Sequence, residues 1–405
     1  MSDPAPPSAP PPGTARLLVV DDNADNRDVL TRRLRRLGYT QLETAADGEA
    51  ALAALAAASF DVVLLDVTMP RVDGVAVLSA MRDAGRLERT AVIMISASTE
   101  LDTVVRCIAL GAEDYLPKPF NPVLLQARLG AVLERQALRA EIRRQLDRME
   151  QELAEARRQQ LDMLPHEFPR GLGRLRVAVH AVMQPAREVG GDLYDCFAAG
   201  PTALCLAVGD VSDKGMPAAL FMARTRSLLR ASALQFAAIA GRLPRPAELL
   251  RAMNEELCKN NPVGMFVTLW LGLLDVDSGR LDYANAGHVL PWLMRHDGAI
   301  TEIACRPGLP LGASLHARHT DETLMLAPGD ALVVITDGLP EMMDEAGAFF
   351  SLDRVAATLA GLRGADAESM AERLVATSLA FRGAAPQADD AAALVVRLAA
   401  DGEVA

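Results

Sequence analysis

The sequence is poor in cysteine and has no paired cysteine motif. Its 405 residues include five cysteines, none in a CxxC pair and none followed six positions later by arginine: Cys107, Cys196, Cys205, Cys258 and Cys305. An odd, scattered set of cysteines argues against a disulfide framework and indicates reduced thiols. The missing arginine also excludes the CxxxxxR loop on which cysteine-dependent phosphatases rely.

Long apolar runs and an excess of positive charge are also lacking. The longest strongly apolar stretch, Met265–Leu274, is far shorter than the roughly 18 residues that cross a bilayer, so no membrane partner is expected. The first residues, MSDPAPPSAPPPG, have neither the basic start nor the apolar core of a secretory signal, so we expect a cytoplasmic protein. The net charge of −12 has the wrong sign for a protein that coats nucleic acid.

The length and the residue pattern predict more than one α/β domain. Residues 1–14 are rich in proline and are expected to form a disordered tail. In residues 15–133, continuous apolar runs alternate with helical patterns, and the runs are LLVV, VVLLD and AVIMIS. Such runs are typical of strands buried on both faces of a parallel sheet, which predicts a doubly wound (βα)5 domain.

Residues 134–165 are predicted to form a helical linker. From Pro122 to Pro165 no other proline occurs, and the only glycine is Gly130. Seven residues, all but the glutamine apolar or small, follow a 4-3 spacing through this charged stretch: Ile142, Leu146, Met149, Leu153, Ala156, Gln160 and Met163. Two interpretations stay open, a single helix lying on its own domain or a coiled coil that joins two copies of the chain. The coiled coil is the preferred one, and it predicts a homodimer.

Residues 166–400 mix strand and helix patterns. The strand candidates are LRVAVHAVM, ALCLAVGD, FVTLWLGLLD, RLDYANAG, ALVVITDG and AALVVRLA, with helices expected over 216–236, 245–259 and 367–380. The segment DVDSGRLDY between two of these strands predicts a hairpin turn. The pattern predicts a layered α/β domain with mainly antiparallel sheets.

Polar side chains follow the strands of the N-terminal domain. Asp21 and Asp22 follow LLVV, Asp66 ends VVLLD, Ser96 ends AVIMIS, and Lys118 lies in YLPKP. Because the carboxyl ends of parallel strands meet at one edge of a sheet, we expect these side chains to converge. Three carboxylates suit Mg²⁺, while a lysine and a hydroxyl suit phosphate oxygens. Helix capping would explain one or two of these positions but not the whole set.

This region resembles the receiver domain of bacterial two-component response regulators. The motifs VVDD, VVLLDVTMPRVDG, ISAS and GAEDYLPKPF occur in the family's order. The resemblance implies that a histidine kinase phosphorylates Asp66, and that Asp22 and Asp21 hold Mg²⁺ together with Asp66 and the Thr68 carbonyl. It further implies that Ser96 and Lys118 bind the phosphoryl group and that Tyr115 is the switch aromatic.

Four acidic motifs mark the C-terminal region: EVGGDLYD, GDVSDKGMPAAL, TDGLPE and QADDAAALVV. Glycine lets the backbone turn beside a bound ion, and aspartate supplies a hard ligand. Carboxylates from distant segments suit two Mg²⁺ or Mn²⁺ ions that activate a water for attack on phosphorus. The plain alternative is a set of Asp-Gly turns, which four such motifs make improbable. No GxSxG, GxxxxGK[ST] or HExxH motif points to another chemistry.

The C-terminal region resembles the metal-dependent PPM protein phosphatases, in the bacterial branch named after stage II sporulation protein E. GGDLYD, GDVSDKGMPAALFM, ANAGH, GLPLG and TDG occur in family order, after the lead-in RRQQLDMLP. The resemblance places four aspartates at catalytic metal-ligand positions, with Val211 offering a backbone carbonyl and Asp390 as the weaker member of its pair: Asp192, Asp210, Asp337 and Asp389. The implied substrate is a phosphorylated anti-sigma-factor antagonist, hydrolysed at phosphoserine or phosphothreonine.

Three departures from the family pattern leave other functions open. Asp213 stands where the family has glycine, Pro340 replaces threonine, and Ala392 replaces a polar residue. These changes support an alternative in which an inactive phosphatase fold serves as an adaptor for a sigma factor or its regulator. A DNA-binding regulator is a third possibility, against which the acidic charge argues. His288 of ANAGH is either a substrate contact or a buried structural residue.

Overall fold

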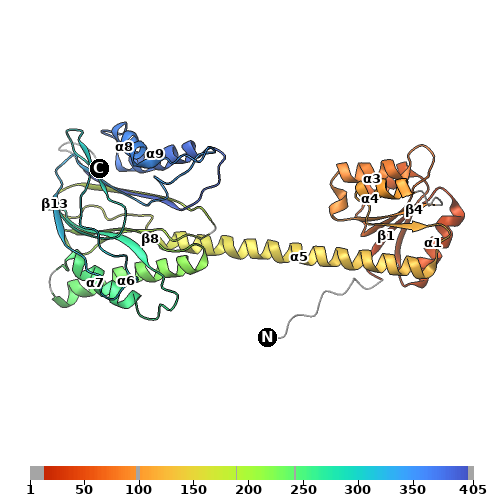
Figure 1. Ribbon diagram of the computed structural model, residues 1–405, viewed down its shortest axis with the longest axis horizontal. Coiled ribbons are helices and arrows are strands. Elements are labelled where there is room, and N and C mark those ends of the chain that lie inside the picture. The colour runs from red at the N-terminus through yellow and green to blue at the C-terminus, as the bar shows by residue number, and fades with distance from the viewer. Residues whose placement is uncertain (1–12, 97–100, 188, 241–242, 400–405) are drawn as a thin grey trace. The chain divides into compact units, whose positions relative to one another are not determined.

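The computed structural model describes residues 13–96, 101–187, 189–240 and 243–399. It divides into two compact units, Met1–Glu150 and Gln151–Ala405 (Figure 1). The predicted tail over 1–14 lies outside the described residues except for its last two positions. Among the described helices, none has the length and apolar character needed to cross a bilayer.

The first unit is built on a five-stranded parallel sheet in the order β2-β1-β3-β4-β5. Its strands are β1 (Arg16–Val20), β2 (Gln41–Ala45), β3 (Val62–Asp66), β4 (Ala91–Ser96) and β5 (Asp114–Pro117). Its helices are α1 (Ala24–Arg36), α2 (Gly48–Ala57), α3 (Gly74–Asp83), the short 3-10 helix η1 (Arg86–Glu88) and α4 (Leu101–Ala109), followed by the start of α5 (Pro122–Met163).

Helices cover both faces of this sheet, as the continuous apolar runs predict. Alternate strand residues pack on one side against α1 and α5, with Leu30 and Leu129 fully buried there. The other strand residues pack against α2 and α3, where Leu55 and Leu78 are buried. The predicted doubly wound fold is therefore confirmed.

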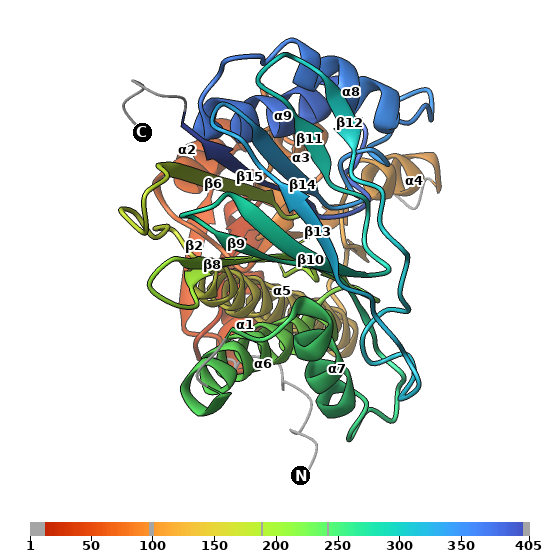
Figure 2. The same cartoon turned by 90° about the vertical axis from the view of Figure 1, so that its left-hand side faces the viewer.

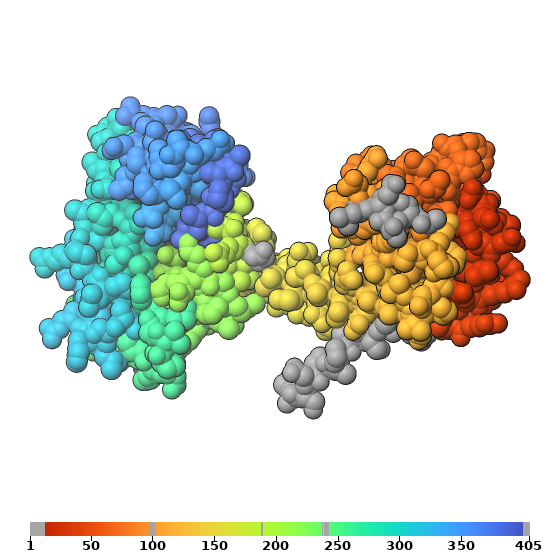
Figure 3. Space-filling view, turned by 45° about the vertical axis from the view of Figure 1, so that its right-hand side comes forward, coloured from red at the N-terminus to blue at the C-terminus, as the bar shows by residue number. Residues whose placement is uncertain are grey.

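Helix α5 is continuous over 42 residues, and the boundary between the two units falls within it. Its first turns belong to the core of the first unit, and Leu164, just beyond its end, belongs to the core of the second. Between these ends the stripe residues Ile142, Leu146 and Met149 are 57%, 54% and 59% exposed. Figure 3 shows the surface of this stretch in yellow. The predicted long helix is confirmed, and the first part of its apolar stripe is exposed, whereas Leu153, Ala156 and Gln160 farther along are half-buried.

The second unit contains two five-stranded sheets whose described strand pairs are all antiparallel. One has the order β13-β10-β9-β8-β7 and comprises β7 (Leu193–Ala198), β8 (Ala203–Val211), β9 (Val267–Asp275), β10 (Arg280–Ala286) and β13 (Glu322–Met325). The other has the order β12-β11-β14-β15-β6 and comprises β6 (Val177–Gln184), β11 (Trp292–Met294), β12 (Ile300–Glu302), β14 (Ala331–Ile335) and β15 (Ala391–Leu398).

The two sheets enclose a core, and helices cover their outer faces (Figure 2). Helices α6 (Met216–Ala240) and α7 (Pro246–Leu257) pack on the first sheet. Helices α8 (Ser351–Ala360) and α9 (Ala367–Arg382) pack on the second. Side chains from both sheets, among them Trp270 and Leu394, are buried between them. The predicted layered α/β domain is confirmed, whereas β7, β11 to β13 and α8 were not among the predicted elements.

Candidate functional sites

The receiver-like site lies where the strands of the parallel sheet end. Asp21 directly follows β1, Asp66 is the last residue of β3, and Lys118 directly follows β5. Asp21 and Asp66 are buried, whereas Asp22 is exposed. One carboxylate oxygen from each of these aspartates lies within 4.8 Å of the others. Three such oxygens fit the hard oxygen ligation that Mg²⁺ requires.

A lysine ammonium bridges the two buried carboxylates. Lys118 Nζ lies 2.8 Å from Oδ2 of Asp21 and 2.8 Å from Oδ2 of Asp66. Burial raises the pKa of Asp66, although its hydrogen bond to Lys118 works against this rise. Burial by itself would lower the pKa of Lys118, but its hydrogen bonds to both carboxylates outweigh this and raise the pKa. The pair therefore holds opposite charges in place at the predicted phosphorylation site.

The other predicted receiver residues lie on the same edge of the sheet. Ser96 ends β4 and is buried, and Thr68 follows β3 at the surface. Tyr115, in β5, is half-buried against the core that α2 and α3 cover. The sequence interpretation missed Asn26, whose Nδ2 donates to Asp21 Oδ1 over 3.1 Å and so fixes that carboxylate. The residue lies five positions after Asp21, a spacing that carries no motif.

The second site draws on both sheets of the C-terminal unit. Asp192 immediately precedes β7 and Asp210 lies near the end of β8, both in one sheet. Asp337 follows β14 and Asp389 precedes β15, both in the other sheet. The structure thus places the four predicted catalytic aspartates at strand ends that meet between the sheets.

Glycines allow these segments to approach one another closely. A Cβ atom on Gly191 would lie 2.8 Å from the Val211 carbonyl oxygen and 3.3 Å from Asp210 Oδ1. A Cβ atom on Gly338 would lie 1.8 Å from the Asp390 carbonyl oxygen. Only glycine fits at such distances, because real side chains do not come this near to backbone atoms. The glycines of GGD and TDG therefore serve the packing of the site itself.

The carboxylates of this site raise one another's pKa. Burial, followed by the charges of Asp210 and Asp390, holds the pKa of Asp192 well above its usual range. Burial and the charges of Asp337 and Asp389 raise the pKa of Asp210 to about 7. Burial and the charge of Glu341 raise the pKa of Asp337. A cluster of buried and half-buried carboxylates fits a site built for positive charge, and two Mg²⁺ or Mn²⁺ ions would supply it.

The four aspartates are more widely spread than those of the receiver-like site. Within the described part of the chain, no three of them bring an oxygen each within 4.8 Å of the others. Thr336 was missed by the sequence interpretation, although its hydroxyl donates to Asp192 Oδ2 over 2.7 Å and orients that carboxylate.

The adjacent aspartates 389 and 390 have different partners. Both oxygens of Asp390 accept backbone hydrogen bonds, one from the Ala186 amide at 2.8 Å and the other from the Gly191 amide at 2.9 Å. Asp389 Oδ2 instead lies 2.7 Å from Nζ of Lys214, another residue that the sequence interpretation missed. Asp390 thus ties the GGD segment to β15. Asp389 is the member of the pair whose carboxylate contacts the Lys214 ammonium group.

The last aspartate of GGDLYD has a structural contact of its own. Asp195 is buried and accepts two hydrogen bonds of 2.7 Å from Arg230, which lies in α6. Arg226 Nε lies 3.1 Å from the same carboxylate. These contacts fix β7 to the helix that covers its sheet, so the motif contains both a candidate ligand and a fold-stabilising residue.

Helix α5 reaches the GGD segment through Gln160. Its Nε2 donates to the Gly190 carbonyl oxygen over 2.6 Å, and its Oε1 accepts from the Gly190 amide at 3.0 Å. Gly190 itself lies so close to Asp390 that a Cβ atom would come within 1.8 Å of Oδ2. A shift of this end of α5 would therefore act directly on the backbone two residues before Asp192.

The departures from the family pattern have modest structural consequences. Asp213 has a φ of +70°, in the left-handed region that glycine adopts without strain. Pro340 and Ala392 are buried, and the Ala392 amide donates to Thr336 Oγ1 over 2.9 Å.

His288 is buried, and its Nδ1 lies 3.0 Å from Thr268 Oγ1. Burial lowers the pKa of His288 to about 4, which favours the structural interpretation of this residue.

Comparison with known families bears directly on these two sites. The family model for the response regulator receiver domain matches residues 17–130. The family model for Stage II sporulation protein E (SpoIIE) matches residues 200–399. The chain belongs to the response regulators, joining a receiver domain to a SpoIIE-type PPM phosphatase domain.

Individual relatives agree with this assignment. Chemotaxis protein CheY of Pseudomonas aeruginosa is 32% identical over 120 residues, which is 30% of this chain and 97% of CheY. Protein IcfG of Synechocystis sp. is 31% identical over 228 residues, which is 51% of this chain and 35% of IcfG. Matches to the first curated relatives span between 35% and 48% of their lengths.

A solved structure supports the fold of the phosphatase domain. The SiaA-PP2C domain of Pseudomonas aeruginosa superimposes with a TM-score of 0.53 and 21% sequence identity. The match covers 62% of this chain and 98% of the SiaA domain. At this level of identity the likeness concerns the fold alone.

Proposed function

We propose that this response regulator is a metal-dependent protein serine/threonine phosphatase, controlled by phosphorylation of Asp66. The observation that carries the proposal is the convergence of Asp192, Asp210, Asp337 and Asp389 from two sheets, with the pKa of Asp192 and of Asp210 raised. When two Mg²⁺ or Mn²⁺ ions are bound there, they supply an activated water and neutralise the phosphate charge. The Val211 carbonyl, packed against Gly191, is a further proposed ligand.

The proposed partners follow from the two families. A cognate histidine kinase would supply the phosphoryl group for Asp66, with Mg²⁺ held by Asp21, Asp22 and Asp66. The proposed substrate is a phosphorylated anti-sigma-factor antagonist, whose dephosphorylation would release a sigma factor in the cytoplasm. The match to the SpoIIE family supports this substrate class.

The proposed coupling element is α5. Phosphorylation of Asp66 would reorient Ser96 and Tyr115 and so change how the receiver holds the first turns of the helix. At its other end Gln160 holds Gly190 by two hydrogen bonds, next to the first candidate ligand. We further propose that the exposed stripe of α5 pairs with the same stripe of a second copy, because a coiled coil would cover it.

The test is Mn²⁺-dependent release of phosphate from a phosphoserine protein substrate by the full chain. We expect turnover by the wild type and a loss of at least about a hundredfold in Asp210→Asn, because a ligand carboxylate would be replaced by an amide. Asp297→Asn, which removes an exposed carboxylate in the turn between β11 and β12, is the matched control and should retain full activity. Absence of turnover in the wild type, with and without phosphorylated Asp66, would refute the proposal and favour the adaptor function.

A further inference from the structure

A third group of metal-ligating side chains lies on the phosphatase domain, outside both sites described above. Its first member is His180, in the edge strand β6. Alternate residues of a strand face the same side of the sheet. Ala178 and Val182, two positions before and after His180, pack into the core that α8 and α9 cover. The imidazole therefore faces the helices rather than the core between the sheets.

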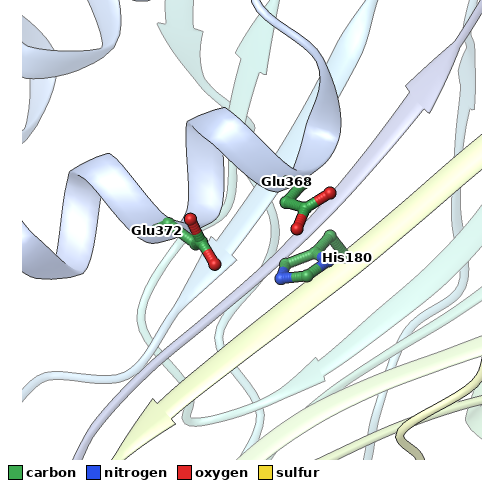
Figure 4. Close-up of side chains that lie close together, drawn as sticks. All are labelled: His180, Glu368 and Glu372. Carbon is green, nitrogen blue, oxygen red and sulfur yellow. The ribbon is translucent and has the colours of Figure 1, made fainter.

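The other two members come from α9, which packs against β6. Glu368 and Glu372 are four residues apart and so share one face of the helix. Both are exposed, and His180 is half-buried. One imidazole nitrogen and one oxygen from each glutamate all lie within 4.8 Å of one another. Figure 4 shows the three side chains directed into the same space between the strand and the helix.

We propose that His180, Glu368 and Glu372 bind a divalent transition-metal ion, with Zn²⁺ the best match. Zn²⁺ accepts imidazole nitrogen and carboxylate oxygen together, and three protein ligands leave a fourth position for water. Two glutamates at this spacing repel each other unless a cation lies between them. Within the described part of the chain, neither glutamate has an arginine or lysine nitrogen within 4.0 Å, although Arg397 lies on the same face of the sheet as His180.

The donor set separates this site from the other two. The receiver-like and phosphatase sites offer carboxylate and carbonyl oxygens, which suit Mg²⁺ and Mn²⁺. An imidazole ligand shifts preference toward zinc and its neighbours. An ion bound here would join the edge strand β6 to α9, two elements that are otherwise held by apolar packing. Its expected role is to stabilise the phosphatase domain, away from the reacting groups.

The proposal is tested by loading the full-length protein with Zn²⁺ in a large excess of Mg²⁺, which occupies the all-oxygen sites. After gel filtration, elemental analysis should find about one Zn²⁺ per chain in the wild type. His180→Ala and Glu372→Gln should each bind Zn²⁺ at least about tenfold more weakly, since even indirect perturbations of metal ligands cost that much. His316→Ala, which removes an exposed histidine of the same domain, is the control and should bind as the wild type does.

A spectroscopic measurement distinguishes the loss of a metal ligand from misfolding of a variant. Cu²⁺ bound in place of Zn²⁺ should show nitrogen coupling in its electron paramagnetic resonance spectrum, and Glu372→Gln should keep that coupling while His180→Ala loses it. Because Glu372 is exposed, its variant should also keep the thermal unfolding profile of the metal-free protein. Failure of the wild type to retain Zn²⁺ over Mg²⁺ would overturn the proposal, as would equal retention by His180→Ala. Neither result depends on phosphatase activity.

Discussion

Replacing Gln160 by alanine removes the two hydrogen bonds that join α5 to the GGD segment. Both partners are backbone groups of Gly190, at 2.6 Å and 3.0 Å. A hydrogen bond of this kind contributes about 0.5–1.5 kcal/mol net, so the pair contributes about 1–3 kcal/mol. Because Gln160 is half-buried and water can replace part of the loss, the lower part of that range applies, about 1–2 kcal/mol.

This free energy should appear as weaker metal binding at the phosphatase site. The two bonds fix the backbone beside Asp192, so their loss lowers the population of the segment that is ready to bind metal. A change of 1–2 kcal/mol corresponds to a factor of about 5–30. We therefore expect the Mn²⁺ concentration for half-maximal phosphate release to rise about 5- to 30-fold in Gln160→Ala, with little change in the rate at saturating Mn²⁺.

The neighbouring glutamine provides the matched control. Gln159 is exposed, and its side chain donates to Glu155 within the same helix, over 3.3 Å. Gln159→Ala should leave the Mn²⁺ dependence unchanged, whereas Gln160→Glu, which keeps an acceptor for the Gly190 amide, should fall between wild type and Gln160→Ala. Identical Mn²⁺ curves for wild type and Gln160→Ala would refute the reasoning, and so would equal shifts in both alanine variants.

Three further predictions concern the stripe of α5, the packing at Gly190 and the protonation of Asp210. Replacing Ile142 and Leu153 by glutamine should make phosphate release independent of Asp66 phosphorylation and lower the mass measured by light scattering from dimer to monomer; preserved coupling would contradict the role of the stripe. Gly190→Ala should abolish activity and destabilise the chain by about 1–3 kcal/mol, measured by urea unfolding, because its Cβ would lie 1.8 Å from Asp390 Oδ2. Burial and neighbouring carboxylates raise the pKa of Asp210 to about 7, so the metal-free chain should lose stability as the pH rises from about 4 toward 7, and Mn²⁺ must displace a proton below 7. The increase in Tm on adding Mn²⁺ should therefore grow between about pH 6 and pH 8, and an increase that is equal at both pH values would argue against this protonation.

Local sequence patterns identified three of the five strands of the first unit, and its doubly wound class, but not β2 and β5. The apolar runs over β1, β3 and β4 are continuous because both faces of that sheet are covered. Each of these strands can therefore be predicted from its own residues, without knowledge of the strands beside it. The long α5 was equally predictable from an uninterrupted helical composition. In the second unit β7 was missed, because its Asp195 interrupts an otherwise apolar segment and is compensated by Arg230 from a different element.

In the candidate sites, the sequence predicted the possible metal ligands but not the residues that hold them in place. The aspartates that could bind metal were found because they stand in recognisable motifs, at the ends of apolar strands or beside glycines. Their partners were not, since Gln160, Lys214 and Thr336 act through contacts with residues far away in the chain. Asp213 stands where the family has glycine, and its φ of +70° lies in the left-handed region that glycine adopts without strain.

The sequence alone determined which residue types are available for phosphoryl and metal chemistry, and in which order the two domains follow one another. The tertiary structure alone decided how the aspartate pair 389–390 is used, because only the folded chain brings the amides of Ala186 and Gly191 to Asp390. It also decided that His180 meets Glu368 and Glu372. The physical reason is that hydrogen bonding and ligation depend on distances of a few ångströms between side chains, and for residues far apart in the chain those distances are set by packing rather than by local sequence.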